Sequence, residues 1–339
     1  MKYFYILIVT LVCFAVLHAQ TQLIPGKVQK ISIVSKLDNS SQPVKIMPAS
    51  GDAPRPLLVV LHTWSQSVNS GTGSYVKLCK QKNWHMVFPH FRGPNWTPEA
   101  CGSDLVISDI EDAVSYMCKN FNVDPKRIYL LGGSGGGHCS LLMAGRRPDL
   151  FTAVSSWCPI SDIARWHAEK RLHNRHSRYA DHIEKSCGGD PAVSPAAKYQ
   201  AQLRSPLSWL ANAAGKTIID ISTGIHDGHT GSVPVGHAIR AYNMLADVND
   251  RISDKDIQFI EKNRRVPDHL AVKTSDPAYG KHTVYLRKIS NRVRLTLFEG
   301  GHNIFPDIGG EFLERQCAGH APDFSNGKAL NNKMVELTK

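Results

Sequence analysis

The chain has 339 residues, of which 42% are hydrophobic and 20% are charged. This composition is typical of a globular protein and excludes disordered, collagen-like and coiled-coil chains. Lys and Arg number 40 and Asp and Glu 29, so the formal net charge is +11, but the cations are spread along the chain, which argues against nucleic-acid binding.

The first residues have the pattern of a secretory signal peptide. Lys2 precedes an almost unbroken apolar run from Tyr5 to Leu17, and Ala19 offers a small residue for cleavage. The run is short for a spanning helix, and no later segment is long and apolar enough to cross a bilayer. We therefore expect a signal peptide over residues 1–19 and a secreted or periplasmic protein without stable membrane insertion; an N-terminal membrane anchor is the alternative.

Short apolar segments predict a sheet whose strands run mainly parallel. Residues 28–34 and 43–47 are β-branched and bounded by turn residues, which predicts an antiparallel hairpin. Continuous apolar runs, typical of buried parallel strands, follow. They span residues 57–61, 86–88, 128–131, 154–157, 218–221 and 293–298.

Helical spacing of apolar residues appears between these strands, over residues 106–117, just after Ser134 and over 237–246. The alternation of strands and helices predicts an α/β fold with a single domain over residues 20–339. Two polar segments interrupt the alternation, at residues 159–216 and 247–281. We expect the first to form a cap over a site and the second to form surface helices.

The segment from Gly132 to Gly136 reads Gly-Gly-Ser-Gly-Gly, with a predicted strand before it and a predicted helix after it. It fits G-x-S-x-G, the nucleophile elbow, a tight turn that lifts a serine hydroxyl out of a sheet. The pattern predicts Ser134 as a nucleophile and the backbone N–H of Gly135 as a donor to a developing oxyanion. A phosphate-binding loop would require a following Lys, which this segment lacks.

A serine nucleophile needs a base, and the base needs an orienting carboxylate; in this fold class the order is Ser, Asp or Glu, His. Asp227 follows the strand at 218–221, and His302 follows the strand at 293–298. The order predicts Ser134, Asp227 and His302 as a catalytic triad. Asp220 competes with Asp227, but its place inside a strand indicates a structural role.

Metal binding is the alternative for the segment that contains Asp227. His226, Asp227 and His229 could be read together as metal ligands, although no further matching ligand stands out elsewhere in the sequence. The seven cysteines after the apolar run include no Cys-x-x-Cys pair, and their odd number leaves at least one free thiol. We expect no metal and no cofactor.

The loop after the strand at 57–61 is expected to supply the second oxyanion donor, the backbone N–H of Trp64 or, as the weaker candidate, that of Thr63. The Trp64 ring could also form an apolar wall for the substrate. Within the cap, Trp166, Arg171 and Arg175 belong to a basic and aromatic stretch. They are predicted to bind the substrate and to attract an anionic one, such as a polysaccharide that bears uronic acids; a solvated surface is the alternative.

From Leu57 to about Gln316, the chain resembles the serine α/β-hydrolase superfamily. Within it, the chain is similar to exported hydrolases of the prolyl-oligopeptidase and acetyl-xylan-esterase types. The elbow around Ser134 and the segment Gly300-Gly301-His302 carry the resemblance, together with Asp227-Gly228-His229. It implies an α/β-hydrolase fold and acyl transfer by Ser134, Asp227 and His302 without a cofactor.

The oligopeptidases carry a large N-terminal propeller, whereas here a hairpin precedes the predicted hydrolase domain. The resemblance therefore implies a carboxylic-ester hydrolase, with acetyl or feruloyl groups on plant polysaccharide as the expected substrate. Two alternatives stay open: a small serine peptidase or aminopeptidase, and a hydrolase-fold binding protein without catalysis.

Overall fold

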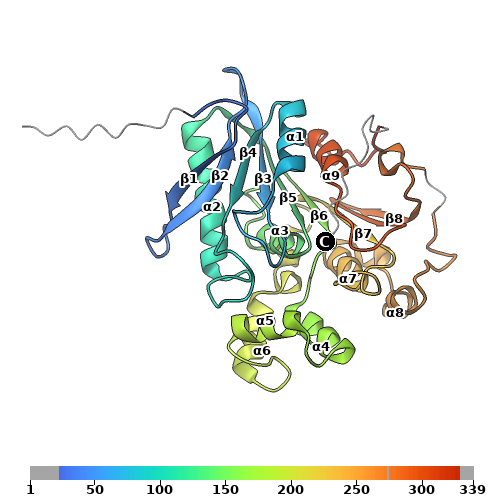
Figure 1. Cartoon of the computed structure of the whole chain (residues 1–339). Coiled ribbons are helices and arrows are strands. Elements are labelled where there is room, and N and C mark those ends of the chain that lie inside the picture. The colour runs from blue at the N-terminus through green and yellow to red at the C-terminus, as the bar shows by residue number, and fades with distance from the viewer. Residues whose placement is uncertain (1–22, 273–274, 329–339) are drawn as a thin grey trace, which may run out of the picture.

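The computed structural model describes residues 23–272 and 275–328, around a nine-stranded sheet with the strand order β1-β2-β4-β3-β5-β6-β7-β9-β8 (Figure 1). The strands are β1 (Gln29–Val34), β2 (Ser41–Met47), β3 (Arg55–Leu61), β4 (His85–Pro89), β5 (Val123–Gly133), β6 (Ala153–Trp157), β7 (Ile218–Gly224), β8 (Val284–Ser290) and β9 (Val293–Phe298). The α-helices are α1 (Gly73–Lys82), α2 (Asp104–Asn120), α3 (Gly135–Arg146), α4 (Ile163–His173), α5 (Arg178–Cys187), α6 (Pro195–Leu203), α7 (Gly236–Leu245), α8 (Asp254–Asn263) and α9 (Pro306–Glu314). Short 3-10 helices are η1 (Pro206–Ser208), η2 (Leu210–Ala213), η3 (Val248–Asp250) and η4 (Pro277–Tyr279).

The sheet is parallel through its centre. Strands β4, β3, β5, β6, β7 and β9 pair in parallel, while β1–β2 form an antiparallel hairpin at one edge and β8 runs antiparallel to β9 at the other. The predicted hairpin and the mainly parallel sheet are confirmed. Strand β8 was not predicted, because Arg287 and Lys288 interrupt its apolar pattern, and β5 begins at Val123, ahead of the predicted run at 128–131.

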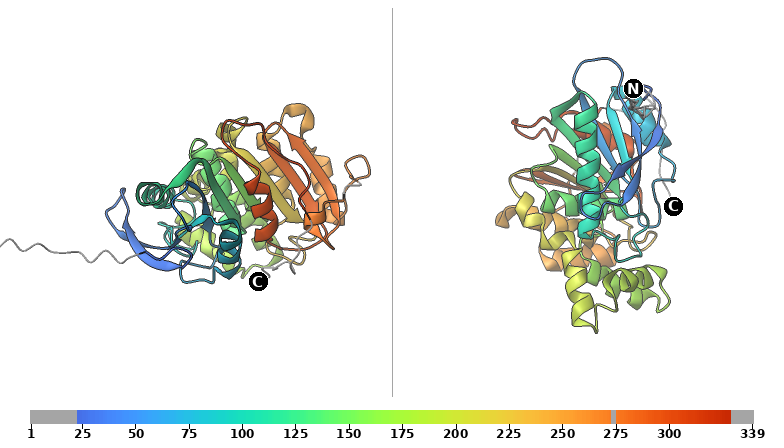
Figure 2. Two further views of the ribbon diagram at one scale, coloured as in Figure 1. Left: turned by 90° about the horizontal axis from the view of Figure 1, so that it is seen from above. Right: turned by 90° about the vertical axis from the view of Figure 1, so that its left-hand side faces the viewer.

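Helices cover both faces of the sheet (Figure 2). Helices α2, α3, α7 and α8 bury apolar side chains in one large core against one face, and α1 and α9 form a second core against the other. Helix α2 shows why the sequence folds this way. Its apolar residues recur every three to four positions, and the Ser103 hydroxyl accepts a hydrogen bond from the Val106 N–H at the helix start.

Asp220 of β7 is paired inside the sheet. Arg294 of β9 donates from Nε to Asp220 Oδ1 at 2.7 Å, and both side chains are buried. A buried carboxylate needs such a partner, since an unpaired charge in the core is costly. Asp220 therefore has a structural role, as its position inside a strand predicted.

Helices α4, α5 and α6 lie between β6 and β7 in the chain and gather beyond the carboxyl ends of the central strands (Figure 1). We call this segment, residues 159–216, the cap. Buried apolar residues from all three helices, such as Ile163, Ile183 and Ala197, form a core together with Trp64 and Cys101 of the main body. Within the cap Arg204 is buried, and its guanidinium donates to the carbonyls of Pro98 (2.9 Å) and Ala100 (2.7 Å) in a loop of the main body.

Residues 1–19, for which a signal peptide is expected, lie outside the described residues. Among the residues that are described, the helices are all too short or too polar to cross a membrane.

Candidate active site

Ser134 stands at the turn between β5 and α3, in the left-handed region with φ 58° and ψ −119°. The turn requires glycine on both sides of the serine. A Cβ on Gly132 would lie 2.1 Å from the Gly136 carbonyl oxygen, and a Cβ on Gly136 would lie 2.3 Å from the Leu61 carbonyl oxygen. The strained backbone of a non-glycine residue, held by this close packing, is the arrangement expected of a nucleophile elbow.

Asp227 and His302 meet across the ends of β7 and β9. The Nδ1–H of His302 donates to Asp227 Oδ2 at 2.7 Å. The other oxygen of Asp227 accepts from the backbone N–H groups of Gly228 (2.9 Å) and Val233 (3.2 Å). The carboxylate is therefore held by three donors, which fixes the imidazole ring and its tautomer.

The Nε2 atom of His302 is buried and has no hydrogen-bond partner among the described residues. With Nδ1 donating to Asp227, Nε2 is the ring atom that is left to accept a proton. The segment that carries His302 packs against the elbow: a Cβ on Gly133 would lie 2.3 Å from Ile304 Cδ1, two residues after His302. In structures without a substrate, the hydrogen bond between nucleophile and base is often long or poorly aligned, and it forms fully only when the substrate binds.

The predicted oxyanion donors lie side by side. A Cβ on Gly135 would lie 2.4 Å from the backbone nitrogen of Trp64 and 2.5 Å from its Cα, so only glycine permits this approach. The competing donor, the N–H of Thr63, is directed to the Gln66 side-chain oxygen at 3.4 Å. Two adjacent backbone N–H groups beside a serine hydroxyl can stabilise an oxyanion on the atom that the hydroxyl attacks.

The rings of Trp64 and Trp166, which are predicted to bind the substrate, pack against each other. Both are buried, and they pack edge to face with ring centroids 4.8 Å apart. The Trp64 indole donates to His182 Nδ1 at 3.3 Å and the Trp166 indole to the Ser232 carbonyl at 2.9 Å. At the junction of cap and main body these two rings are occupied by packing, and their contact with a substrate stays a prediction.

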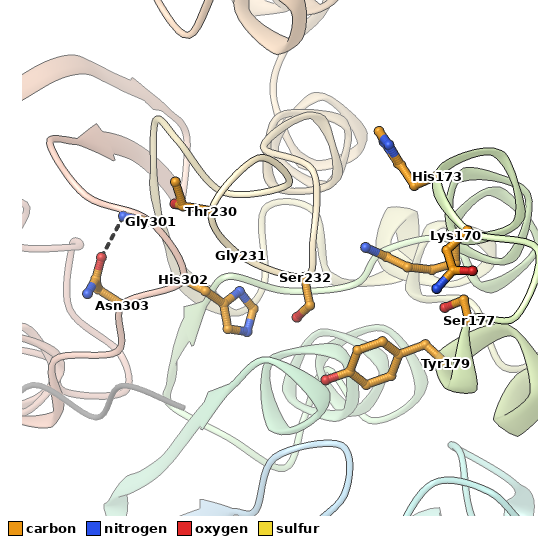
Figure 3. Close-up of a pocket in the computed structure, with 11 residues that line it drawn as sticks. Lys170, His173, Ser177, Tyr179, Thr230, Gly231, Ser232, Gly301, His302 and Asn303 are labelled. Atoms are coloured by element: carbon orange, nitrogen blue, oxygen red, sulfur yellow. Dashed lines mark hydrogen bonds between the residues drawn. The ribbon is translucent and has the colours of Figure 1, made fainter.

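A cavity of about 590 Å³ opens beside His302 (Figure 3). Its walls come from the cap and from the loops that follow β7 and β9. The lining residues are Lys170, His173, Asn174, Ser177, Tyr179, Thr230, Gly231, Ser232, Gly301, His302 and Asn303.

Arg171 and Arg175, predicted to bind the substrate, are not on this wall. The Arg171 guanidinium pairs with Asp181 at 2.7 Å and with Glu184 at 2.6 Å, and it also donates to the Arg175 carbonyl. These ion pairs tie α4 to α5 and orient Arg171 toward α5. Lys170, one residue earlier on α4, lines the cavity instead.

The histidines around Asp227 have separate partners. His226 Nε2 contacts Glu299 Oε1 at 3.0 Å, and His229 Nε2 donates to the Glu261 carbonyl at 2.7 Å. Within the described parts of the chain, the groups whose ligand atoms lie within 4.8 Å of one another are Cys158–Asp227–His302 and His167–Glu184–Asp190. Neither group contains His226 or His229, so the sequence triplet does not converge on one point.

Cys158 is a member of the site that the sequence analysis missed. It directly follows β6, it is buried, and its Sγ lies within 4.8 Å of the ligand atoms of Asp227 and His302. The thiol donates to the Asn303 carbonyl at 3.3 Å. Burial and the negative charge of Asp227 raise its pKa well above the usual range, so the sulfur stays a neutral thiol. Its position at the end of a central strand was the signal that could have found it.

Comparisons with known proteins agree with this geometry. The family model described as "Prolyl oligopeptidase family" matches residues 78–260, more than half of the chain. The fold matches the acylaminoacyl peptidase of Pyrococcus horikoshii with a TM-score of 0.58 and 15% identity, over 88% of this chain and 43% of that one. It also matches a prolyl endopeptidase with a TM-score of 0.50 and 18% identity, over 65% of this chain and 32% of that one.

A curated relative, the acetylxylan esterase of Coprinopsis cinerea, is 42% identical over 48 residues, which are 14% of this chain and 13% of that protein. The chain thus spans less than half the length of each of these proteins. The structural matches confirm the α/β-hydrolase fold, and the family model covers the elbow and Asp227. The chain belongs to the prolyl oligopeptidase family of serine hydrolases.

Proposed function

We propose that this serine hydrolase cleaves carboxylic esters of carbohydrates by way of an acyl-enzyme. The observation that carries the proposal is the chemistry of the cavity beside His302. Among the described residues that line it, none is Asp or Glu, and hydroxyl and amide side chains come from Asn174, Ser177, Tyr179, Thr230, Ser232 and Asn303. Hydroxyl and amide groups match the hydrogen-bonding surface of a sugar.

In the first half of the reaction, the Ser134 hydroxyl attacks the ester carbonyl carbon while His302 Nε2 takes its proton. Asp227 stabilises the imidazolium that results. The N–H groups of Trp64 and Gly135 hold the carbonyl oxygen as it becomes negative. The carbon–oxygen bond to the alcohol then breaks, and His302 returns the proton to the departing alkoxide.

In the second half, His302 removes a proton from water as the water oxygen attacks the acyl-Ser134 carbonyl. The bond between the acyl group and Ser134 breaks, the serine oxygen takes the proton back, and a carboxylic acid leaves. The residues described here complete this cycle with water as the only co-reactant.

A peptidase is the second candidate, favoured by the structural neighbours, which are named as peptidases. An aminopeptidase holds the positively charged amino end of its substrate, and a carboxylate is the natural partner for that charge. The described wall of the cavity offers Lys170 and His173 and lacks such a carboxylate. The match to an acetylxylan esterase, although it covers only 14% of the chain, also supports the ester.

We further propose that residues 1–19 are removed on export, so that the enzyme meets polysaccharide outside the cytoplasm. This proposal rests on Lys2, the apolar run from Tyr5 to Leu17 and the small residue Ala19. Mass spectrometry of the mature N-terminus checks it. A mature protein that retains its initial segment would contradict it.

A substrate panel with a Ser134→Ala control tests the function. The wild type should release acid from 4-nitrophenyl acetate, methyl ferulate or acetylated xylo-oligosaccharide, and it should leave peptide anilides intact. Loss of the triad's function costs about 10⁶-fold in kcat in serine hydrolases, so Ser134→Ala should show no turnover above background. Cleavage of peptide amides, together with no cleavage of acetylated oligosaccharides, would indicate the peptidase. The absence of both turnover and fluorophosphonate labelling would indicate a binding protein without catalysis.

A further inference from the structure

A helix of the cap contacts Trp64, the residue expected to supply the second oxyanion donor. The Trp64 indole N–H donates to Nδ1 of His182 in α5 at 3.3 Å, although the two residues are 118 positions apart in the chain. The imidazole ring also packs on Trp96, with ring centroids 4.8 Å apart, and on Tyr179 at 6.3 Å. Because the Trp64 side chain is buried, His182 satisfies a donor that would be costly to leave unpaired.

The backbone of Trp64 is held by a second route that ends on the same helix. The backbone N–H and the side-chain amide of Asn95 both donate to the Trp64 carbonyl, at 2.9 Å and 3.2 Å. The Ser186 hydroxyl of α5 lies within hydrogen-bonding distance of the carbonyls of Asn95 (3.2 Å) and His182 (2.9 Å). Asn95 and Ser186 are both buried. Helix α5 therefore holds Trp64 at its ring directly and at its carbonyl through Asn95.

Helix α4 connects Trp64 to the loop of Asp227. The Trp166 ring packs on the Trp64 ring, and its indole N–H donates to the Ser232 carbonyl at 2.9 Å. The next residue, Val233, donates its backbone N–H to Asp227 Oδ1 at 3.2 Å. The cap thus contacts both the loop of the expected oxyanion donor and the loop of the triad carboxylate, so the geometry of the site depends on how the cap packs.

From these contacts we infer that His182 is a positioning residue for the oxyanion hole, acting through Trp64. The inference rests on the proposed acyl-enzyme reaction, in which the Trp64 N–H is an oxyanion donor, and it applies to an ester or an amide substrate. The Trp64 backbone fits closely against the elbow, since a Cβ on Gly135 would lie 2.4 Å from the Trp64 nitrogen. A small shift of Trp64 therefore changes the direction of its N–H at the serine.

The kinetic consequence follows from when the oxyanion forms. A donor aimed at the carbonyl oxygen stabilises the charge that develops in the transition state more than it stabilises the bound substrate. If the Trp64 indole loses its acceptor, a buried N–H is left unpaired, and the ring must turn to find another partner. The loss should therefore appear in kcat and leave KM nearly unchanged.

The hydrogen bond requires a neutral His182, because a protonated imidazole has no acceptor at Nδ1. Burial lowers the pKa of His182 below its usual value, and the positive charges of Lys185 and Arg178 act in the same direction. Asp181, the acidic neighbour, opposes this change and is the smallest of these effects. The imidazole therefore accepts the indole N–H at neutral pH.

The test compares His182→Leu, which removes the acceptor, with His182→Asn, whose side-chain oxygen takes the place of Nδ1. The matched control is His176→Leu, since His176 is exposed, lies between α4 and α5 and is not among the described residues that line the cavity. Loss of a whole oxyanion donor costs about 10²–10³-fold in kcat. A donor that is displaced but present should cost less, about 10-fold in His182→Leu on 4-nitrophenyl acetate, with KM within about threefold. His182→Asn and His176→Leu should stay within about threefold of the wild type in kcat.

Inhibition by a trifluoromethyl ketone gives a readout that does not depend on the amount of folded enzyme. The Ser134 oxygen bonds to the ketone carbon, His302 takes the serine proton, and the ketone oxygen receives the electron pair and the negative charge. The inhibition constant should rise about 10-fold in His182→Leu, in parallel with the fall in kcat/KM. A loss of folded protein would lower only the apparent kcat and leave KM and the inhibition constant unchanged.

Trp64→Phe removes the same hydrogen bond from its other side and keeps the backbone N–H. It should also lower kcat about 10-fold, and the double variant Trp64→Phe with His182→Leu should be no slower than the slower of the two single variants. Such non-additivity is expected when two changes break one contact.

Each comparison has a result that overturns the inference. An unchanged kcat and inhibition constant in His182→Leu would do so and leave ester hydrolysis intact. An equal fall in His182→Asn and His182→Leu would show that the acceptor is not what matters, and an equal fall in His176→Leu would indicate a general effect of changes in the cap. Effects that multiply in the double variant would show two independent roles. A folded wild type that turns over neither esters nor amides would refute the proposed function itself.

Discussion

Replacing Gly231 by alanine should disable the dyad of Asp227 and His302 by steric displacement alone. A Cβ at Gly231 would lie 2.3 Å from Asp227 Oδ1 and 2.5 Å from His302 Cβ. Gly231 is not among the glycines with positive φ, so its backbone conformation is one that alanine adopts without strain. The added methyl group is therefore the whole perturbation.

The magnitude follows from the two distances. Carbon atoms pack at about 3.5–4.0 Å, so a methyl group at 2.5 Å from His302 Cβ must push that residue or its own loop by about 1 Å. A displacement of about 1 Å at catalytic groups can cost about 10²-fold in rate. We expect kcat/KM to fall about 100-fold, with a loss of unfolding free energy of about 1–3 kcal/mol from the overpacked loop.

Steady-state kinetics on 4-nitrophenyl acetate, with thermal unfolding of the same samples, measures both effects. Gly71→Ala is the matched control, because a Cβ at Gly71 meets nothing within 4 Å and its φ is not positive. The rate of fluorophosphonate labelling of Ser134 should fall in parallel with kcat/KM in Gly231→Ala. A folded Gly231→Ala enzyme with the turnover of the wild type would refute the reasoning.

Three further changes have defined outcomes. Asp227→Asn should lower kcat about 10⁴-fold without unfolding the chain, because an amide no longer holds the required imidazole tautomer; near-normal kcat would contradict the role of Asp227. Burial lowers the pKa of His138 to about 4, whereas a histidine in the unfolded chain has a pKa of about 6.5. Between these two pH values only the unfolded chain binds this proton. The unfolding free energy therefore falls as the pH drops through this window. His138→Gln should lessen that fall, by an amount on the order of 3 kcal/mol, in denaturant titrations at both ends of the window. Iodoacetamide near neutral pH should label the exposed Cys118 and spare Cys158, whose pKa is raised by burial, so that activity survives; peptide mapping that finds Cys158 modified together with inactivation would be the contrary result.

The parts of the fold and site that could be predicted are those encoded by short, regular patterns. Continuous apolar runs gave the central strands, and the loops after two of them contain Asp227 and His302, whose side chains are hydrogen-bonded at 2.7 Å. The elbow around Ser134 can be recognised in the sequence because its close backbone contacts exclude every residue larger than glycine from positions 132 and 136.

The cap could not be predicted to the same depth, because composition does not say which side of a helix a residue occupies. Arg171 and Lys170 are neighbours in a basic stretch, yet Asp181 and Glu184 on α5 draw Arg171 away while Lys170 lines the cavity. Those acids lie ten or more residues further along the chain. The ion pairs of Arg171 depend on how α4 packs against α5, and a local sequence pattern does not predict that packing.

The buried Arg204, which binds the cap to the main body, affects which sequence changes this enzyme can tolerate. Its guanidinium is received by the carbonyls of Pro98 and Ala100, and its own carbonyl accepts from His138 Nε2 at 2.7 Å. Backbone carbonyls are present whatever side chains a loop carries, so these two hydrogen bonds do not depend on the identity of the side chains at positions 98 and 100. Mutational tolerance is therefore unequal within this contact: the two accepting carbonyls persist through side-chain changes in the loop, whereas loss of Arg204 would leave several buried acceptors without their donor.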